Sequence, residues 1–221
     1  MIEFKHVYKA YGSHDPCLRD VNFQINEGDF VFLVGPSGSG KTTIFKLITA
    51  YEAKSSGDIS VLGHNLSELR KGQIPFLRRE VGLVLQNYKL LKDKTVFENI
   101  ELPLLIRETG AEERKVRVEK IIDRLGLQNV ADQFPDFLSG GEQQRVAIGR
   151  ALVGEPKIII ADEPTGNLDP DLSVNIMKLF REFSQQGITF VVATHDYRLI
   201  DAAKSRVLQI NNGQIVEGLQ R

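Results

Sequence analysis

A short glycine-rich stretch carries the residues of this sequence that are best suited to chemistry. It follows the apolar run 30–34 and leads into the apolar-rich segment 44–48, an order typical of a strand, a turn and a helix. Glycines let backbone N–H groups curl around a phosphate chain, and the following helix directs its positive dipole end at the same anion. The stretch therefore predicts a phosphate-binding P-loop. Its residues are Gly35, Pro36, Ser37, Gly38, Ser39, Gly40, Lys41, Thr42 and Thr43.

Two side chains of this loop suit specific tasks in a nucleotide site. The ammonium group of Lys41 can lie on the β- and γ-phosphates, and the hydroxyl of Thr42 can ligate Mg²⁺. The alternative is an ordinary glycine-rich turn, and average residue usage produces this pattern in about one chain in a hundred of this size. The strand before the loop and the helix after it favour the nucleotide site.

Two acidic side chains follow the apolar run 157–161 and form a second candidate site. A buried strand that ends in acids places them at the carboxyl edge of a sheet, where open α/β folds bind ligands. Asp162 is suited to hold Mg²⁺ directly or through water, and Glu163 to orient and deprotonate an attacking water. Solvated acids at a strand end are common on their own, but a P-loop in the same chain favours hydrolysis.

The segment 138–145 holds a third candidate site, at the predicted start of a helix. Ser139 and Glu142 have the spacing of a capping box, in which each side chain binds the backbone N–H of the other residue. Capping alone does not require Gly140 and Gly141, and these glycines leave backbone N–H groups open to an anion. The residues alone are equally consistent with a helix cap and with a second phosphate contact.

The motifs need an α/β core to position them. Continuous apolar runs at 30–34, 157–161 and 188–193 are typical of parallel strands buried on both faces. Alternating apolar and polar residues in 2–8 and 17–26 predict an antiparallel pair with one solvated face. The fold class predicted is therefore α/β, with a mostly parallel sheet and an N-terminal antiparallel β-subdomain.

The remaining elements are a hairpin and a group of helices. Asn212 and Gly213, between apolar segments, predict a C-terminal hairpin. About 70 residues between the strand near Gln86 and the strand at 157–161 are mostly helical in pattern, which is too long for one crossover. We therefore expect a helical subdomain at 88–154, inserted in a catalytic core of 1–87 and 155–221. The predicted helices are 95–106, 111–125 and about 141–153.

The composition limits the classes of protein that this chain can be. Its 221 residues are 42% hydrophobic, which suits one substantial core. Twenty-eight Lys and Arg against 29 Asp and Glu leave a net charge of −1, which argues against a broad nucleic-acid surface but not against a local patch. Cys17 is the lone cysteine, the N-terminus lacks a signal-peptide pattern, and the apolar runs are too short to cross a bilayer. We expect a soluble cytoplasmic chain that reaches a membrane through a partner.

The segment from Leu138 through Ser139, Gly140, Gly141 and Glu142 to Arg145 resembles the signature motif of the ATP-binding cassette (ABC) ATPases. Other motifs follow in the order of that family. Tyr11 resembles the aromatic residue that stacks on adenine, Gln86 the Q-loop glutamine that touches Mg²⁺ and the transmembrane partner, and His195 the switch histidine on the γ-phosphate. The D-loop is represented by Asn167, Leu168 and Asp169.

The resemblance to ABC ATPases implies hydrolysis of ATP with Mg²⁺, by a P-loop NTPase fold. It implies a head-to-tail homodimer that forms on ATP, in which each ATP lies on one P-loop and faces Ser139 and Gly141 of the other copy. In that arrangement the catalytic residues are Lys41, Glu163 and His195, and the metal is held by Thr42, Gln86 and Asp162.

The segment 74–86 resembles the cell-division members of this family, which signal through an integral membrane partner to cell-wall hydrolases. That resemblance implies a peripheral protein on the cytoplasmic face of the membrane at the division site, with the partner docked near Leu90, Leu91 and the helix after Thr95. Two alternatives stay open: an ATPase subunit of a lipoprotein-releasing or macrolide-type exporter, and an ATP-gated module that recruits cytoplasmic division proteins. Gly149 departs from the usual alanine and costs up to about 1 kcal/mol of helix propensity.

Overall fold

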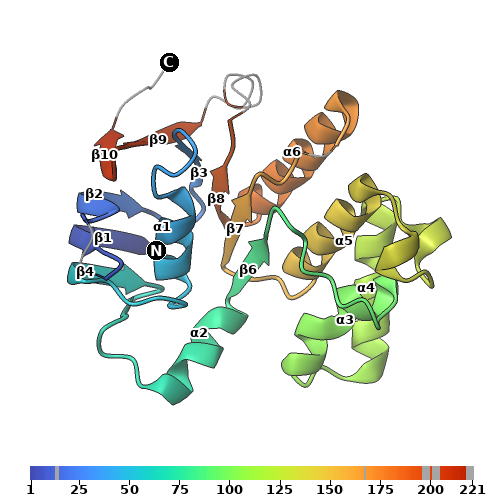
Figure 1. Cartoon of the computed structure of the whole chain (residues 1–221). Helices are drawn as coiled ribbons and strands as arrows, with labels where there is room; N and C mark the ends of the chain where they lie inside the picture. The colour runs from blue at the N-terminus through green and yellow to red at the C-terminus, as the bar shows by residue number, and fades with distance from the viewer. Residues whose placement is uncertain (13–14, 167, 196–199, 201–204, 218–221) are drawn as a thin grey trace.

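The computed structural model describes residues 1–12, 15–166, 168–195, 200 and 205–217 (Figure 1). Within these ranges the chain folds into two β-sheets with helices packed beside them. No helix among the described residues is both long enough and apolar enough to span a membrane.

The central sheet has the strand order β10-β9-β3-β8-β7-β6. All neighbouring strands from β9 to β6 run parallel, and only the β9–β10 pair is antiparallel. Every residue of β3 and β8 is buried, which explains their continuous apolar runs and confirms the predicted parallel core. The hairpin predicted at Asn212 and Gly213 is also confirmed, with both residues at positive φ. The strands are β3 (Phe30–Val34), β6 (Val81–Val84), β7 (Ile158–Asp162), β8 (Thr189–Ala193), β9 (Arg206–Asn211) and β10 (Gln214–Glu217).

The second sheet is antiparallel and has the order β2-β1-β4-β5. The expected pair is confirmed, with Ile2 opposite Ile25 and Phe4 opposite Phe23. Sequence reasoning left the other two strands unassigned, because only Ile59 and Val61 are buried in the otherwise polar β4. The strands are β1 (Ile2–Lys9), β2 (Leu18–Ile25), β4 (Ser56–Val61) and β5 (His64–Asn65).

The helices include the three that the sequence predicts between β6 and β7, each confirmed to within one residue. Sequence reasoning did not assign α2 or α6. Short 3₁₀ turns at Lys71–Gln73, Gln128–Val130 and Pro135–Phe137 connect the helices and strands. The helices are α1 (Lys41–Ile48), α2 (Ile74–Arg79), α3 (Val96–Ile106), α4 (Ala111–Arg124), α5 (Gly140–Leu152) and α6 (Pro170–Gln185).

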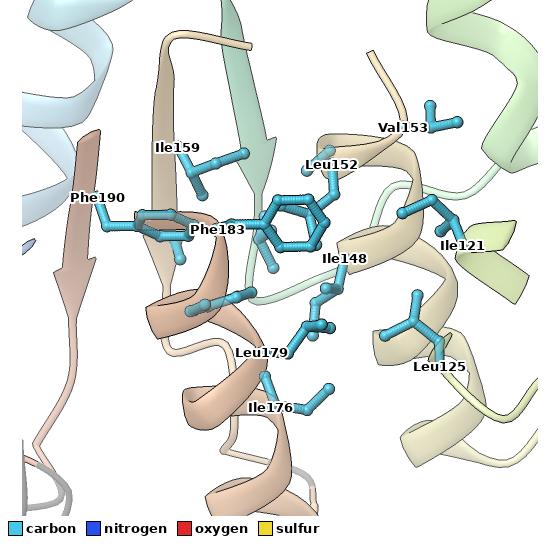
Figure 2. Close-up of a cluster of buried hydrophobic side chains, with 14 of the residues drawn as sticks. Ile121, Leu125, Ile148, Leu152, Val153, Ile159, Ile176, Leu179, Phe183 and Phe190 are labelled. Carbon is cyan, nitrogen blue, oxygen red and sulfur yellow. The ribbon is translucent and has the colours of Figure 1, made fainter. Parts of the chain in front are cut away.

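The two faces of the central sheet carry separate apolar clusters. Helix α1 and the antiparallel sheet cover one face, and α3 to α6 pack over the other. Figure 2 shows Ile148 and Leu152 of α5 with Leu179 and Phe183 of α6 on one side and Ile121 of α4 on the other. One apolar cluster thus continues from the sheet into the region 88–154, so α5 is held firmly against the core.

Candidate active site

The P-loop joins β3 to α1. The backbone conformation and the contacts within the chain explain why two of its residues are glycines. Gly40 is the N-cap of α1 with φ 112°, a conformation that side chains with a Cβ rarely adopt. At Gly35 a Cβ would lie 2.3 Å from the carbonyl oxygen of Ile210, so with any other residue at this position the loop could not pass this close to β9. No side chain caps α1 and no acid lies in its first turn. The helix therefore presents an uncapped, positive N-terminus, which suits an anion.

Lys41 and Ser39 provide donors inside this loop. The Lys41 ammonium donates to the carbonyl oxygens of Gly35, at 2.7 Å, and Pro36, at 3.0 Å, so it lies over the loop. The Ser39 hydroxyl is buried and has no hydrogen-bond partner in the part of the chain that the structure describes. Pro36, Ser37 and Gly38 form the exposed rim. The loop thus combines a cation, a free hydroxyl and an open edge, which fits a phosphate chain.

Three oxygen-bearing side chains meet beside the loop. The Thr42 hydroxyl donates to Asp162 at 3.3 Å, and both residues line a cavity of about 530 Å³ together with Gln86. Burial raises the pKa of Asp162, an effect that the Thr42 hydrogen bond and the Lys41 charge partly offset. Hydroxyl, carboxylate and amide oxygens are the ligands that Mg²⁺ prefers. This donor set fits Mg²⁺, with phosphate oxygens and waters to complete its coordination.

Glu163 and His195 meet at the carboxyl ends of β7 and β8. The Glu163 carboxylate lies 2.8 Å from Nδ1 of His195, and the Glu163 N–H donates to the carbonyl oxygen of Ala193. The Glu163 side chain is largely buried whereas that of His195 is exposed. The structure therefore places side by side two residues that lie 32 positions apart and that sequence reasoning assigned to one reaction.

Tyr11 lies at the edge of the P-loop helix, near Thr43. Its hydroxyl donates to Glu52 at 2.5 Å, while the Lys9 ammonium lies 4.8 Å from the ring centre. The hydrogen bonds from Lys46 and Tyr11 lower the pKa of Glu52 to about 2. Burial and Glu52 raise the pKa of the Tyr11 hydroxyl. The Tyr11 ring remains 42% exposed, so it is fixed in place yet open to stack on a base.

The segment before α5 forms the capping box that sequence reasoning left as one alternative. Ser139 Oγ accepts from the Glu142 N–H at 3.3 Å, and the Glu142 carboxylate accepts from the Ser139 N–H at 2.8 Å and from its hydroxyl at 2.6 Å. These bonds lower the pKa of Glu142. Leu138 is buried beneath the motif, whereas Ser139 and Gly140 are exposed. The cap is observed, but it does not account for the glycines.

Among the described residues, no close contact requires glycine at 140 or 141. In that part of the chain, an added Cβ at Gly140 would meet the Tyr88 hydroxyl alone, at 3.7 Å, and at Gly141 a methyl group of Leu168 alone, at 3.4 Å. Neither glycine has the positive φ that would exclude other residues. Two glycines at this exposed helix start leave its backbone N–H groups open to a close approach from outside.

The structure does not bring the α5 start to the P-loop of the same chain. Helices α1 and α5 pack on opposite faces of the central sheet (Figure 1). In the D-loop, Asn167 lies outside the described residues, and Leu168 is half-buried beside Gly141. Asp169 caps α6, since its carboxylate accepts from the Leu172 N–H at 2.9 Å.

Sequence reasoning missed two residues that hold the site. Glu52 lies 41 positions from Tyr11, and no local pattern links them. Gln144 is 1% exposed and donates from Nε2 to the carbonyl oxygen of Glu163 at 3.1 Å. The signature-like segment includes Gln144, but residue type alone does not show that its side chain points inward.

Comparison with known proteins agrees with this geometry. The model of the ABC transporter family matches residues 18–166. The cell division ATP-binding protein FtsE of Escherichia coli K12 is 44% identical over 219 residues, covering 99% of both chains. FtsE of Haemophilus influenzae is 46% identical, covering 97% of this chain and 99% of its own, and FtsE of Bacillus subtilis is 44% identical, covering 100% and 97%.

Solved structures agree as well. The dimeric structure of the ATP-binding cassette MJ0796 bound to ADP and Pi, in a post-hydrolysis state, has a TM-score of 0.92 at 35% identity, covering 100% of this chain and 99% of its own. A second dimeric structure of MJ0796 has a TM-score of 0.93 at 36% identity and the same coverage. The P-loop NTPase fold and the ATPase activity follow from these matches. The chain belongs to the ATPases of the ABC transporter family and, within it, to the cell division ATP-binding proteins named FtsE.

Proposed function

We propose that this chain is the ATP-hydrolysing subunit of a cell-division complex whose other subunit is an integral membrane protein resembling FtsX. One observation carries the hydrolytic part. Thr42, the adjacent pair Asp162 and Glu163, and His195 come from three separate segments and meet beside the P-loop at one edge of the sheet. The relatives reported above are named as cell-division proteins and not as exporters, which favours the division complex.

Each site residue has a task in the proposed reaction. The P-loop N–H groups and Lys41 hold the phosphates, and Tyr11 stacks on adenine. Glu163 accepts the proton of the attacking water, and His195 orients that carboxylate and contacts the γ-phosphate. The remaining roles concern the metal, which neutralises phosphate charge when bound. We assign it to Thr42, Gln86 and Asp162.

The proposed site is completed by a second copy of the chain. No described residue of the same copy lies close enough to require glycine at 140 or 141, and both MJ0796 structures are dimeric. In the proposed homodimer, Ser139 and Gly141 of one copy contact the ATP held by the P-loop of the other. Moving such a pair from 1% to 99% closed needs roughly 5.5 kcal/mol of differential binding. Several charge-assisted hydrogen bonds to each γ-phosphate are of that order.

An apolar groove offers a docking place for the membrane partner. Two hollows meet at Leu83 and Leu85; one continues to Tyr51 and the other to Ile106. Leu83, Tyr51 and Ile106 are 37%, 71% and 50% exposed, so apolar surface faces outward next to Gln86. A cytoplasmic helix of the partner would cover this surface and sense the metal site through Gln86. The complex would place the chain on the cytoplasmic face of the membrane at the division site, without nucleic acid.

Leu83→Glu tests the proposed partner contact. A carboxylate in the groove should abolish co-purification with the membrane protein and fail to rescue cells depleted of the wild-type protein, while ATP binding by the purified chain stays unchanged. Val116→Glu is the matched control, because Val116 is a 63% exposed apolar residue on α4, outside the groove. Full rescue by Leu83→Glu would contradict the docking proposal.

A further inference from the structure

We infer that Gln144 is a positioning residue for Glu163. Its side-chain amide, projecting from α5, holds the backbone of the proposed general base in the conformation that aims the carboxylate. The inference rests on the proposed role of Glu163 in hydrolysis, and it adds a residue that acts on Glu163 without touching ATP.

The burial of Gln144 requires an explanation. The residue is 1% exposed, among apolar neighbours such as Val146 and Ala147 on the same helix. Burying a polar amide is costly unless it is hydrogen-bonded. Its Nε2 donates to the carbonyl oxygen of Glu163 at 3.1 Å, while its Oε1 is buried without a partner in the described part of the chain. Of the two polar atoms of the amide, only Nε2 has a hydrogen-bond partner among the described residues. The bond to Glu163 is therefore the polar contact that accounts for burying this side chain.

The backbone of Glu163 is strained where Gln144 binds it. Its φ is +50°, the left-handed region that costs a residue with a Cβ of order 1–2 kcal/mol. Three hydrogen bonds hold it: its N–H donates to the Ala193 oxygen at 2.9 Å, and its carbonyl oxygen accepts from the Gly166 N–H at 3.2 Å and from Gln144. The first two come from the adjacent strand and from its own turn, so Gln144 is the contact from the helical region.

The direction of the Glu163 carboxylate depends on this backbone. A left-handed residue points its side chain differently from a residue in an extended strand, and here the carboxylate reaches His195 at 2.8 Å. If the Gln144 bond is lost, the strained peptide can relax and the carboxylate moves. A misplacement of about 1 Å in a catalytic group lowers rate by roughly 10²-fold.

The same helix begins with the capping residue Ser139. Gln144 lies five residues further along, about 7.5 Å along the axis at 1.5 Å per residue. In the proposed dimer, Ser139 of one copy contacts the ATP that the other copy holds. Through the short helical segment from Ser139 to Gln144, this contact would act on Glu163 of the copy to which Ser139 belongs. This gives each copy a route by which one ATP site influences the other.

The test compares Gln144→Met, which keeps the size and removes the donor, with the wild-type protein. ATP affinity and KM should stay within about twofold, and kcat should fall at least 10-fold. In a Glu163→Gln background the same substitution should change the residual rate less than twofold, since the carboxylate that it positions is already gone. Val118→Ala is the control for lost packing: it should lower the melting temperature and leave kcat within twofold.

A second variant, Gln144→Glu, tests the same inference if Gln144→Met folds poorly. In Gln144→Glu the side chain donates to the Glu163 carbonyl only when protonated, so its rate relative to wild type should rise as pH falls from 8 to 6. The inference is overturned if kcat of Gln144→Met stays within twofold of wild type, if the loss is equal in both backgrounds, or if the Gln144→Glu ratio is independent of pH. Wild-type hydrolysis by Glu163→Gln itself would instead overturn the role of Glu163.

Discussion

Two helices of this protein begin with glycine-containing loops, and the reasons for their glycines differ. In the P-loop before α1, Gly35 and Gly40 are needed by the chain itself, one for close approach to β9 and one for a left-handed cap. Before α5, an added Cβ at Gly140 or Gly141 would make no close contact with any residue that the structure describes. The first loop is complete in one copy of the chain. The second leaves open space at an exposed helix start, as the proposed contact with a second copy requires.

The two helix starts differ in charge as well. Helix α1 has no side-chain cap and no acid in its first turn, whereas α5 is capped by Ser139 and carries Glu142. A bare N-terminus attracts phosphate strongly, while a nearby carboxylate opposes it. The P-loop therefore suits a tightly held nucleotide, and the proposed phosphate contact of the α5 start would be the weaker of the two.

Gly40→Ala should have the largest effect. The side chain would be forced into φ 112° and its Cβ would lie 2.7 Å from a Leu18 methyl group. Strain and overpacking together should cost about 2–4 kcal/mol of unfolding free energy. Denaturant unfolding should show this loss and calorimetry should show no ATP binding. Normal stability with normal ATP binding would contradict the internal reason given for this glycine.

Gly141→Ala should leave the folded monomer intact and impair only the assembled enzyme. Among the described residues its Cβ meets nothing closer than Leu168 at 3.4 Å, so the unfolding free energy should change by less than about 1 kcal/mol. ATP binding by the monomer should be unchanged, and steady-state hydrolysis should fall about 10-fold, as expected for one or two weakened hydrogen bonds to phosphate. Wild-type hydrolysis would remove the contrast between the two loops.

Glu142→Gln should strengthen the proposed contact between the α5 start and the ATP of the second copy. Glutamine preserves the capping box but removes the carboxylate from the α5 start. Relief of about 1 kcal/mol of repulsion should lower the ATP concentration for half-maximal dimer formation about fivefold. Titration of the dimer by ATP, followed by light scattering, measures this shift. An unchanged or higher midpoint would show that the charge of Glu142 does not face the nucleotide.

Gly149→Ala should have the smallest effect, and it tests a glycine with an internal reason inside α5. Alanine favours the helix by about 1 kcal/mol, but its Cβ would lie 2.9 Å from Leu125 and 3.0 Å from Ile121. Overpacking costs about 1–3 kcal/mol, so the net loss should be about 1 kcal/mol, or 2–4 °C in melting temperature. A raised melting temperature would mean that α4 shifts away at little cost.

Much of the fold could be predicted, because local patterns encode it. The continuous apolar runs of β3 and β8 predict buried parallel strands, and Asn212-Gly213 predicts the hairpin. Strand β4 escaped prediction because its residues are mostly polar and Gly57 interrupts it at φ 84°. Helix α6 also escaped, although its Asp169 cap could have marked its start.

The site also has parts that local sequence patterns predict and parts that only the folded chain reveals. The P-loop and the Asp162–Glu163 pair are local in sequence, so the sequence alone predicts them as site residues. The hydrogen bonds of Tyr11 to Glu52 and of Gln144 to Glu163 join distant segments, so only the folded chain reveals them. At Ser139 the residues alone do not separate a cap from an anion contact, because one spacing serves both; the structure shows the cap, and the anion contact remains part of the proposal.

Light scattering of Glu163→Gln shows whether the ATP site needs a second copy of the chain. With ATP and Mg²⁺ this variant should bind nucleotide, stop hydrolysing it, and double its mass to a dimer. The double variant Glu163→Gln/Gly141→Asp should bind ATP equally well and remain a monomer. The introduced carboxylate would repel the phosphates of the ATP that the second copy holds. A Glu163→Gln chain that binds ATP but stays monomeric, or a double variant that still dimerises, would contradict the composite site.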